Sequence, residues 1–165
     1  SYMKSLIEKF TEKSQVNLTN VKDMDSQETD EWEENMAYRQ VDEMINGKCA
    51  RILKRPEEMH FISYNVNEDI QQADLFYEYK GETIRYEIYL NQTDSSKGVT
   101  KEDSEVNVYE IKVNGNKVQI EERKIEKIGQ KSLIAEFEYK GVYYQLKGVM
   151  EKSEFNKIIK NLKFY

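Results

Sequence analysis

The chain has 165 residues, the size of one domain, and folding at this length buries roughly 70% of the surface that the unfolded chain exposes. Hydrophobic residues make up 38% and aromatic residues 12%, a globular composition that argues against disorder. The single cysteine excludes an internal disulfide, and the net charge of -6 disfavours nucleic acid, whose partners are basic with clustered Arg and Lys.

A single domain over residues 1–165 is expected, with a helical part over 1–47, an antiparallel sheet over 48–150 and a helix over 151–165. Residues 2–13 place their apolar side chains on one face at about 100° per residue, which predicts an amphipathic helix. Residues 15–21 alternate apolar and polar side chains, which predicts a short strand or an extended connection.

A second helix is expected to begin near Ser26 or Thr29 and to run to Asn46, where Gly47 supplies the left-handed conformation that commonly ends helices. Acidic residues crowd its first turns, where the partial positive charge of a helix N-terminus favours them. Trp32 lies on the far side of this helix from the apolar stripe, and packing in the core is favoured over exposure for its ring. The predicted buried stripe is Ala37, Val41, Met44 and Ile45, with Met36 at its edge.

Charge is distributed unevenly along the chain. Residues 22–43 hold nine acids against two bases, and residues 112–163 hold twelve bases against seven acids. Attraction between these two regions is favoured over an external charged partner. The acidic stretch also matches positions 1, 3, 5 and 12 of a calcium-binding loop, but Glu28 stands where that loop requires glycine, so an acidic helix start is preferred.

From Cys49 onward the apolar pattern changes to a period of 2, and "CARIL" and "MHFISYNV" are predicted strands on either side of Pro56. Three hairpins follow, with Lys80-Gly81, Asn114-Gly115 and Lys140-Gly141 as two-residue loops. Residues paired across such loops share a face, and one set of pairs is apolar throughout, so burial determines the register. The pairs predicted to point inward are Tyr77–Ile84, Leu75–Tyr86, Ala73–Ile88, Ile111–Val118, Tyr109–Ile120, Tyr139–Val142, Phe137–Tyr144 and Ala135–Leu146.

The remaining segments complete the expected fold. Residues 91–105 have the composition of a surface loop. Ser153 is the predicted N-cap of a last helix, whose apolar stripe is Phe155, Ile158, Ile159 and Leu162. Helices at both ends and antiparallel hairpins between them predict an α+β fold, with the N-terminal helices and the C-terminal helix packed on one face of the sheet.

Catalytic and metal-binding chemistry have little support in the sequence. Cys49 and His60 are the only residues of their types, and a Cys–His nucleophilic pair needs contact and a third, orienting group, so a buried thiol and an ordinary histidine are preferred. One histidine and no CxxC pair argue against a transition-metal site. We therefore expect no enzyme, no catalytic residue, no metal and no cofactor.

An interaction surface is the remaining functional candidate. A tyrosine platform for bases or sugars needs its rings on an open face, and the predicted registers turn most tyrosines inward. Phe76 and Tyr143 are predicted to point outward, beside Arg85 and Glu138 respectively, where a helix could cover them or they could form a contact patch. The residues of the candidate interaction surface are Trp32, Phe76, Arg85 and Tyr143.

The stretches "RILKRP", "FYEYKGETIRYEIYL", "YEIKVNGNKVQI" and "LIAEFEYKGVYYQLKGVMEKSEFNKIIKNL" stand in an order that resembles a family of uncharacterised domains of Gram-positive bacteria, over about residues 48–165. Members of that family stand outside the membrane behind a single transmembrane helix, some joined to anti-sigma-factor-like segments. The resemblance implies an extracytoplasmic, non-enzymatic sensory or interaction domain, and it transfers no functional residue. Because the chain begins with Ser1 rather than Met, the transmembrane segment is expected upstream.

The leading hypothesis is a binding or regulatory domain on the extracytoplasmic face of a bacterial membrane. It implies a protein partner, no nucleic acid, and contact with the membrane only through the upstream segment. The alternative is a small-ligand or lipid-carrying protein, or a hydrolase, with a concave sheet pocket lined by Tyr77, Tyr86 and Tyr144. A third hypothesis is a structural module of a cell-surface assembly. The sequence predicts no particular oligomeric state.

Overall fold

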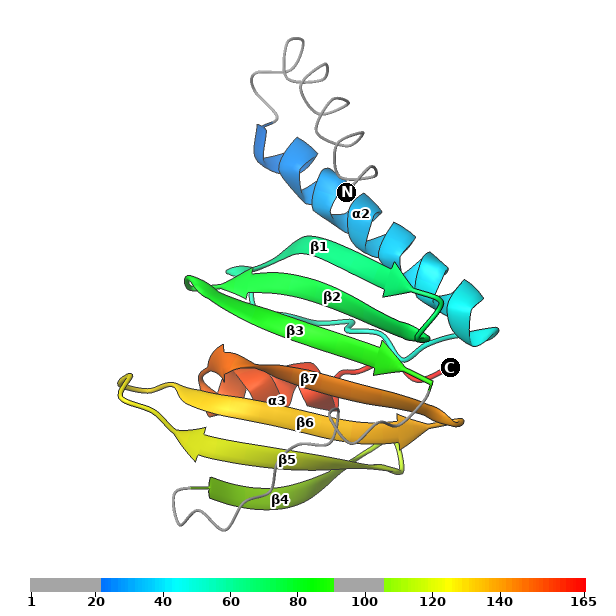
Figure 1. Cartoon of the computed structure of the whole chain (residues 1–165). Coiled ribbons are helices and arrows are strands. Elements are labelled where there is room, and N and C mark those ends of the chain that lie inside the picture. Colours follow the sequence, from blue (N-terminus) through cyan, green and yellow to red (C-terminus); the bar gives the residue numbers. More distant parts are fainter. Residues whose placement is uncertain (1–21, 91–105) are drawn as a thin grey trace.

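A computed structural model describes residues 22–90 and 106–165, with side chains from residue 31 onward in those ranges. Its seven strands form one antiparallel sheet in the order β1-β2-β3-β7-β6-β5-β4, with α2 and α3 against one face (Figure 1). The predicted α+β fold is therefore confirmed. The predicted helix at 2–13, the extended stretch at 15–21 and the loop at 91–105 lie outside the described residues. The elements are α2 (Lys22–Ile45), β1 (Met59–Asn67), β2 (Gln72–Tyr79), β3 (Glu82–Tyr89), β4 (Val106–Val113), β5 (Asn116–Lys124), β6 (Lys131–Tyr139), β7 (Val142–Met150) and α3 (Lys152–Lys160).

All three predicted hairpins are confirmed, with every predicted inward pair in register. Both loop residues of each hairpin have positive φ, for example 50° at Asn114 and 80° at Gly115, as a type I′ turn requires. The lysines at the first loop positions adopt the same left-handed conformation, with φ of 49° at Lys80 and 51° at Lys140. A turn of this type matches the right-handed twist of the strands, and it sets which side chains reach the core.

The C-terminal helix α3 lies behind β7 and β6 in the view of Figure 1 and covers the core face of the sheet. Its predicted stripe of Phe155, Ile158, Ile159 and Leu162 is buried, which confirms the periodicity argument. The predicted N-cap at Ser153 is wrong, because the helix already begins at Lys152 and Glu151 is the N-cap. The Glu151 carboxylate makes no capping bond and instead accepts hydrogen bonds from the Tyr79 hydroxyl and Gln130 Nε2.

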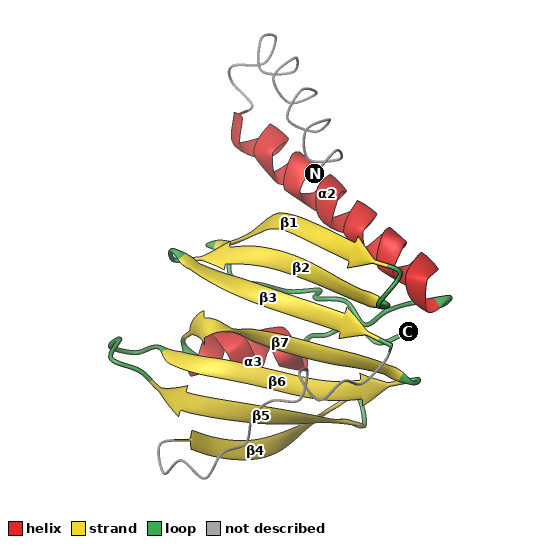
Figure 2. Ribbon diagram, viewed as in Figure 1, coloured by secondary structure: helices red, strands yellow, loops and turns green. Residues whose placement is uncertain are grey.

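The N-terminal helix α2 lies along β1 (Figure 2). It begins earlier than predicted, at Lys22, and Asn46 rather than Gly47 takes the left-handed conformation at its end, with φ of 54°. Of the expected stripe, Ala37 and Val41 are buried and the rest is half-buried. The favoured burial of Trp32 is wrong, because 49% of this side chain is exposed. No helix within the described residues combines the length and the apolar character needed to cross a membrane.

Two acids of α2, Glu34 and Asp42, pair with the segment that follows the helix. Asp42 pairs with Arg51, and Glu34 receives two hydrogen bonds from Nη1 of Arg55, at 2.6 and 2.7 Å. For these two acids the pairs with the arginines at 51 and 55 take the place of the predicted attraction to residues 112–163, whereas the acidic side chains of residues 22–30 lie outside those described. These arginines lie in the connection from α2 to β1, so the pairs hold that connection against the helix.

Tyrosine hydroxyls also hold this connection against the core face. The Tyr86 hydroxyl donates to the main-chain oxygen of Ala50 at 2.7 Å, and the amide of Ala50 donates to the Tyr144 hydroxyl at 2.9 Å. The amide of Ile52 donates to the Tyr38 hydroxyl at 3.0 Å. The strand predicted for the "CARIL" segment is wrong, because the structure shows only an isolated bridge there, from Arg51 to Lys163, and tyrosine hydroxyls bind the backbone of Ala50 and Ile52 instead.

Close packing of β3 against β7 leads to a first prediction. A Cβ atom on Gly148 would lie 2.2 Å from Cδ1 of Ile84 and 3.3 Å from its Cα, so Gly148→Ala is expected to lower the free energy of unfolding by about 1–3 kcal/mol. Urea unfolding measures this loss. Ile84→Val removes the clashing methyl group, so the double variant should lose less than the sum of the two single variants. Strict additivity would contradict the proposed clash.

Candidate functional site

Strand alternation places Phe76, Arg85 and Tyr143 on the outer face of the sheet, the face turned away from α3. The pairing runs straight across the central strands, from Phe76 to Arg85 and from Arg85 to Lys147. On the same face, Glu87 pairs with Gln145 in the next row, and Tyr89 pairs with Tyr143 in the row after that. Three of the four residues of the predicted interaction surface therefore share one face. We call the set Asp74, Phe76, Arg85, Glu87, Tyr89, Tyr143 and Lys147 the outer-face patch.

Arg85 is the centre of the polar part of this patch. Its Nε and Nη2 atoms lie 3.0 and 2.9 Å from Oδ1 of Asp74, and Nη2 lies 3.3 Å from Oε1 of Glu87. The guanidinium also lies over the Phe76 ring, 5.8 Å from its centroid. Lys147 lies 3.9 Å from the other oxygen of Glu87. Because carboxylates and ring hold it on several sides, the guanidinium has one well-defined position on the sheet surface.

The aromatic part of the patch is a stacked pair. The rings of Tyr89 and Tyr143 lie 5.7 Å apart between centroids, with 16° between their planes. Tyr143 is half-buried, whereas Tyr89 is buried and makes further interactions. The patch thus combines an ordered guanidinium with a rigid tyrosine pair, and protein–protein interfaces are enriched in both residue types.

The fourth predicted residue, Trp32, does not join this patch, because it lies on α2. Three further residues of the patch, Asp74, Glu87 and Tyr89, are not among those predicted from the sequence. The signal for the two carboxylates was present, because the hairpin register that pairs Phe76 with Arg85 also places them on the outer face. Both carboxylates are nearly buried, with 8% of Asp74 and 7% of Glu87 exposed, and this burial cannot be predicted from composition alone.

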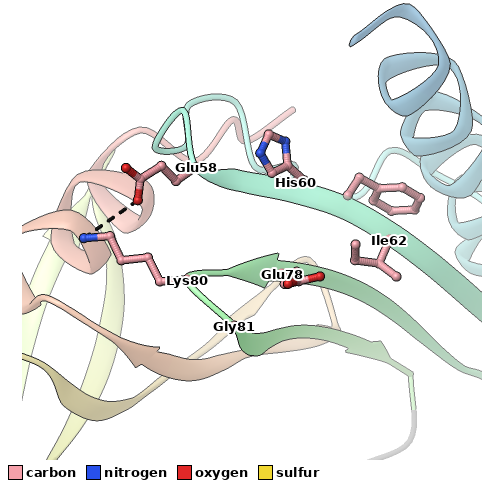
Figure 3. Close-up of a pocket in the computed structure, with 7 residues that line it drawn as sticks. Glu58, His60, Ile62, Glu78, Lys80 and Gly81 are labelled. Carbon is pink, nitrogen blue, oxygen red and sulfur yellow. Dashed lines mark ion pairs between the residues drawn. The ribbon is translucent and has the colours of Figure 1, made fainter. Parts of the chain in front are cut away.

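A hollow at the β1–β2 edge is a second candidate site (Figure 3). A register shift between Phe61 and Ser63 interrupts the alternation of β1 there, at Ile62. Lys80 lies across the hollow, 3.8 Å from a carboxylate oxygen of Glu58. The hollow therefore offers both charges and an apolar wall. Its lining residues are Glu58, His60, Phe61, Ile62, Glu78, Lys80 and Gly81.

The two residues considered for nucleophilic chemistry lie apart. Cys49 is buried with the core cluster, and burial, reinforced by Asp42, raises the pKa of its thiol well above the ordinary value. His60 is exposed on β1, opposite Glu78, with its neighbours Met59 and Phe61 turned into the core. A Cys49–His60 pair therefore cannot form. The residues considered for a calcium loop lie in α2, whose backbone is helical from Lys22 and lacks the turn that such a loop needs.

The interior tyrosines belong to the core. Tyr77, Tyr86 and Tyr144 are at most 1% exposed, and burial is the largest cause of the raised pKa of each hydroxyl. Tyr77 donates to Glu34, while the other two hydroxyls bind the main chain of Ala50. Protein atoms thus occupy the hydrogen-bonding capacity that a ligand in a tyrosine-lined pocket would use.

Comparison with known proteins gives one match. The model of a family described as a domain of unknown function (DUF4367) matches residues 49–162, a range that contains β1 to β7 and α3. No curated protein and no solved structure matches the chain. The outer-face patch and the hollow both lie within the matched range, whereas α2 with Trp32 precedes it.

Proposed function

This chain belongs to the DUF4367 family of domains of unknown function, and from that membership and the geometry of the sheet we propose that it is a protein-binding domain acting through the outer-face patch. The two faces of the sheet differ in what they present. The core face packs against α2 and α3 and uses its tyrosine hydroxyls internally. The outer face presents the ordered Arg85 beside aromatic rings.

The position of Arg85 is the observation that carries this proposal. A flexible arginine loses rotamer freedom when a partner binds, at a cost of about 0.5–1.5 kcal/mol for a rotamer-rich side chain. Asp74, Glu87 and the Phe76 ring already restrict this side chain in the free protein. A partner that contacts the patch therefore meets a preorganised surface, and much of that entropic cost is avoided.

The cellular setting is part of the same proposal. We place the domain on the extracytoplasmic face of a Gram-positive membrane, as a sensory or regulatory module behind a single transmembrane helix. Its support is the resemblance carried by the hairpin order and by the final helix, and the family match covers the same part of the chain. In this setting the domain is not an enzyme, and its partner is a protein.

The binding proposal is tested by site-specific crosslinking in cells of the source organism. A photoreactive phenylalanine at position 143 of the full-length protein is expected to capture one defined protein, and the same group at Ile128, a fully exposed turn residue, is not. Arg85→Lys keeps the charge but loses the planar fork, so it should reduce capture at least about tenfold. Unfolding curves check that each variant is folded. Equal capture from both positions, or capture unaffected by Arg85→Lys, would overturn the role of the patch.

The location is tested separately. Alkaline phosphatase fused after Tyr165 in the full-length gene product should be active, because that enzyme needs an oxidising compartment for its disulfides. β-Galactosidase fused at the same position should be inactive. The opposite result would place the domain in the cytoplasm and would leave the crosslinking result standing on its own.

The hollow at the β1–β2 edge supports a second candidate function, a small-ligand site. The paired Lys80 and Glu58 beside the apolar Ile62 suit a small molecule with one polar and one apolar part. This replaces the earlier idea of a pocket lined by interior tyrosines, because those side chains are committed to the core.

A further inference from the structure

A cluster of cations surrounds Tyr165 at the end of the sheet where the β6–β7 turn lies. Lys48 Nζ, the Arg51 guanidinium and Lys163 Nζ lie 5.2, 5.5 and 5.6 Å from the centroid of its ring. Lys140 Nζ donates to the main-chain oxygen of Tyr165 at 2.6 Å. We propose that this group, the Tyr165 cluster, is a binding site for a phosphate-type anion.

The charge balance of the cluster favours an added anion. Among the described side chains, its four cations form one ion pair with a carboxylate, that of Arg51 with Asp42, so the local balance of these groups is +3 in a chain with a net charge of -6. If a carboxylate on Tyr165 is counted as well, the local charge balance falls from +3 to +2 and is still positive. Repulsion within such a group is a cost that a bound anion removes.

Backbone pairing adds to this cost. The amide of Arg51 donates to the oxygen of Lys163 at 3.0 Å, and the amide of Lys163 donates back at 2.8 Å. Arg51 and Lys163 are therefore directly opposite each other in an antiparallel bridge, where like charges are destabilising. Nε of Arg51 is also buried and, in the part of the chain that the structure describes, has no hydrogen-bond partner.

The cluster is held in place before any ligand binds. The Phe164 ring packs edge-on against Tyr139, with 4.9 Å between centroids and 70° between planes, and against Phe137, with 5.5 Å and 66°. The Tyr139 hydroxyl donates to the main-chain oxygen of Tyr165 at 2.7 Å. The tail that carries Lys163 and Tyr165 is thus fixed to β6, and 41% of the Tyr165 side chain remains exposed to solvent.

Phosphate is the anion class that suits these groups best. Three lysines provide mobile ammonium donors, and Arg51 adds a guanidinium, the two side chains that bind phosphate oxygens most strongly. A phosphate group carries up to two negative charges at neutral pH, enough to offset most of the excess. A phosphodiester of a lipid headgroup and free phosphate share this chemistry, and the experiment below separates them.

Thermal unfolding of the full chain tests the site, with inorganic phosphate compared with chloride at equal ionic strength. Phosphate at ten times its Kd is expected to raise the Tm by about 3 °C. Lys163→Gln should abolish this shift and should raise the Tm in chloride alone, because it relieves repulsion. Lys124→Gln removes a lysine at the opposite end of the sheet, where β5 pairs with β6, and should keep the wild-type response. The general stabilising effect of phosphate salts acts on both variants alike, so this control separates it from binding at the Tyr165 cluster.

The source of the phosphate is distinguished with vesicles. Cosedimentation with phosphatidylglycerol vesicles, absent with phosphatidylcholine and lost in Lys163→Gln, would assign the site to a lipid headgroup, whereas a Tm shift without vesicle binding would assign it to soluble phosphates. Either result supports the proposal. An equal phosphate shift in Lys163→Gln and Lys124→Gln would overturn it, as would the absence of both the Tm shift and vesicle binding.

Discussion

Arg55→Ala is expected to lower the free energy of unfolding by about 3 kcal/mol, at the low end of the cost of breaking a buried ion pair. Glu34 is 7% exposed and loses both of its hydrogen bonds from Arg55 in this variant. Arg55 Nε also donates to the main-chain oxygen of Met59 at 3.0 Å, so the start of β1 loses a contact as well. The low end applies because 24% of the Arg55 side chain is exposed, so water partly replaces it. Equilibrium unfolding in urea measures the loss.

A neutral partner provides the control for this prediction. In the double variant Glu34→Gln/Arg55→Ala no buried charge is left without a counterion, and the loss should fall to about 1–2 kcal/mol. A surface pair gives the matched comparison, because Lys157 and Glu154 on α3 are more exposed and Lys157→Ala should change stability by less than about 1 kcal/mol. If the double variant is no more stable than Arg55→Ala, the cost does not come from an unpaired Glu34.

The hairpins show what could be predicted from the sequence and why. Each depends on local information, namely a glycine-containing loop and a period of 2 that agrees across it. A slip of one residue would expose the whole apolar set. The alternation also predicts which side chains, such as Phe76 and Arg85, point away from the core. These are short-range properties of the chain, so no knowledge of the tertiary structure was needed.

The polar core could not be predicted in this way. Glu34 and Tyr38 lie in a helix whose apolar stripe is weak, and their burial depends on Arg55 and on the "CARIL" segment, which follow in the sequence. From the sequence alone, a carboxylate that becomes buried cannot be distinguished from the other acids of a solvated helix. The same limit applies to Asp74 and Glu87, whose role on the outer face follows from their contacts with Arg85. The burial and the role of these side chains therefore depend on partners elsewhere in the chain, which the local sequence pattern does not indicate.

Removal of α2 is expected to have the largest effect on this protein. A chain that begins at Gly47 should already be unfolded at 25 °C and should show no cooperative transition in a thermal scan, although it keeps the whole family-matched range. The lost burial of Ala37, Tyr38 and Val41, with the loss of the Glu34 pair, is worth on the order of 5 kcal/mol or more, against a total stability of about 5–15 kcal/mol for a domain. Far-UV circular dichroism and a thermal scan measure the outcome.

Point substitutions separate the packing of α2 from its mere presence. Tyr38→Ala in the complete chain removes a side chain that is 2% exposed and the acceptor for the Ile52 amide, so a loss of about 3–5 kcal/mol is expected. Arg39→Ala changes the exposed neighbour and should stay within about 0.5 kcal/mol of the parent. Cooperative unfolding of the chain from Gly47 would show that the sheet and α3 form a complete core. The covering of Tyr77 by Glu34 and Tyr38 argues against that result, because without α2 the buried face of β2 would meet water.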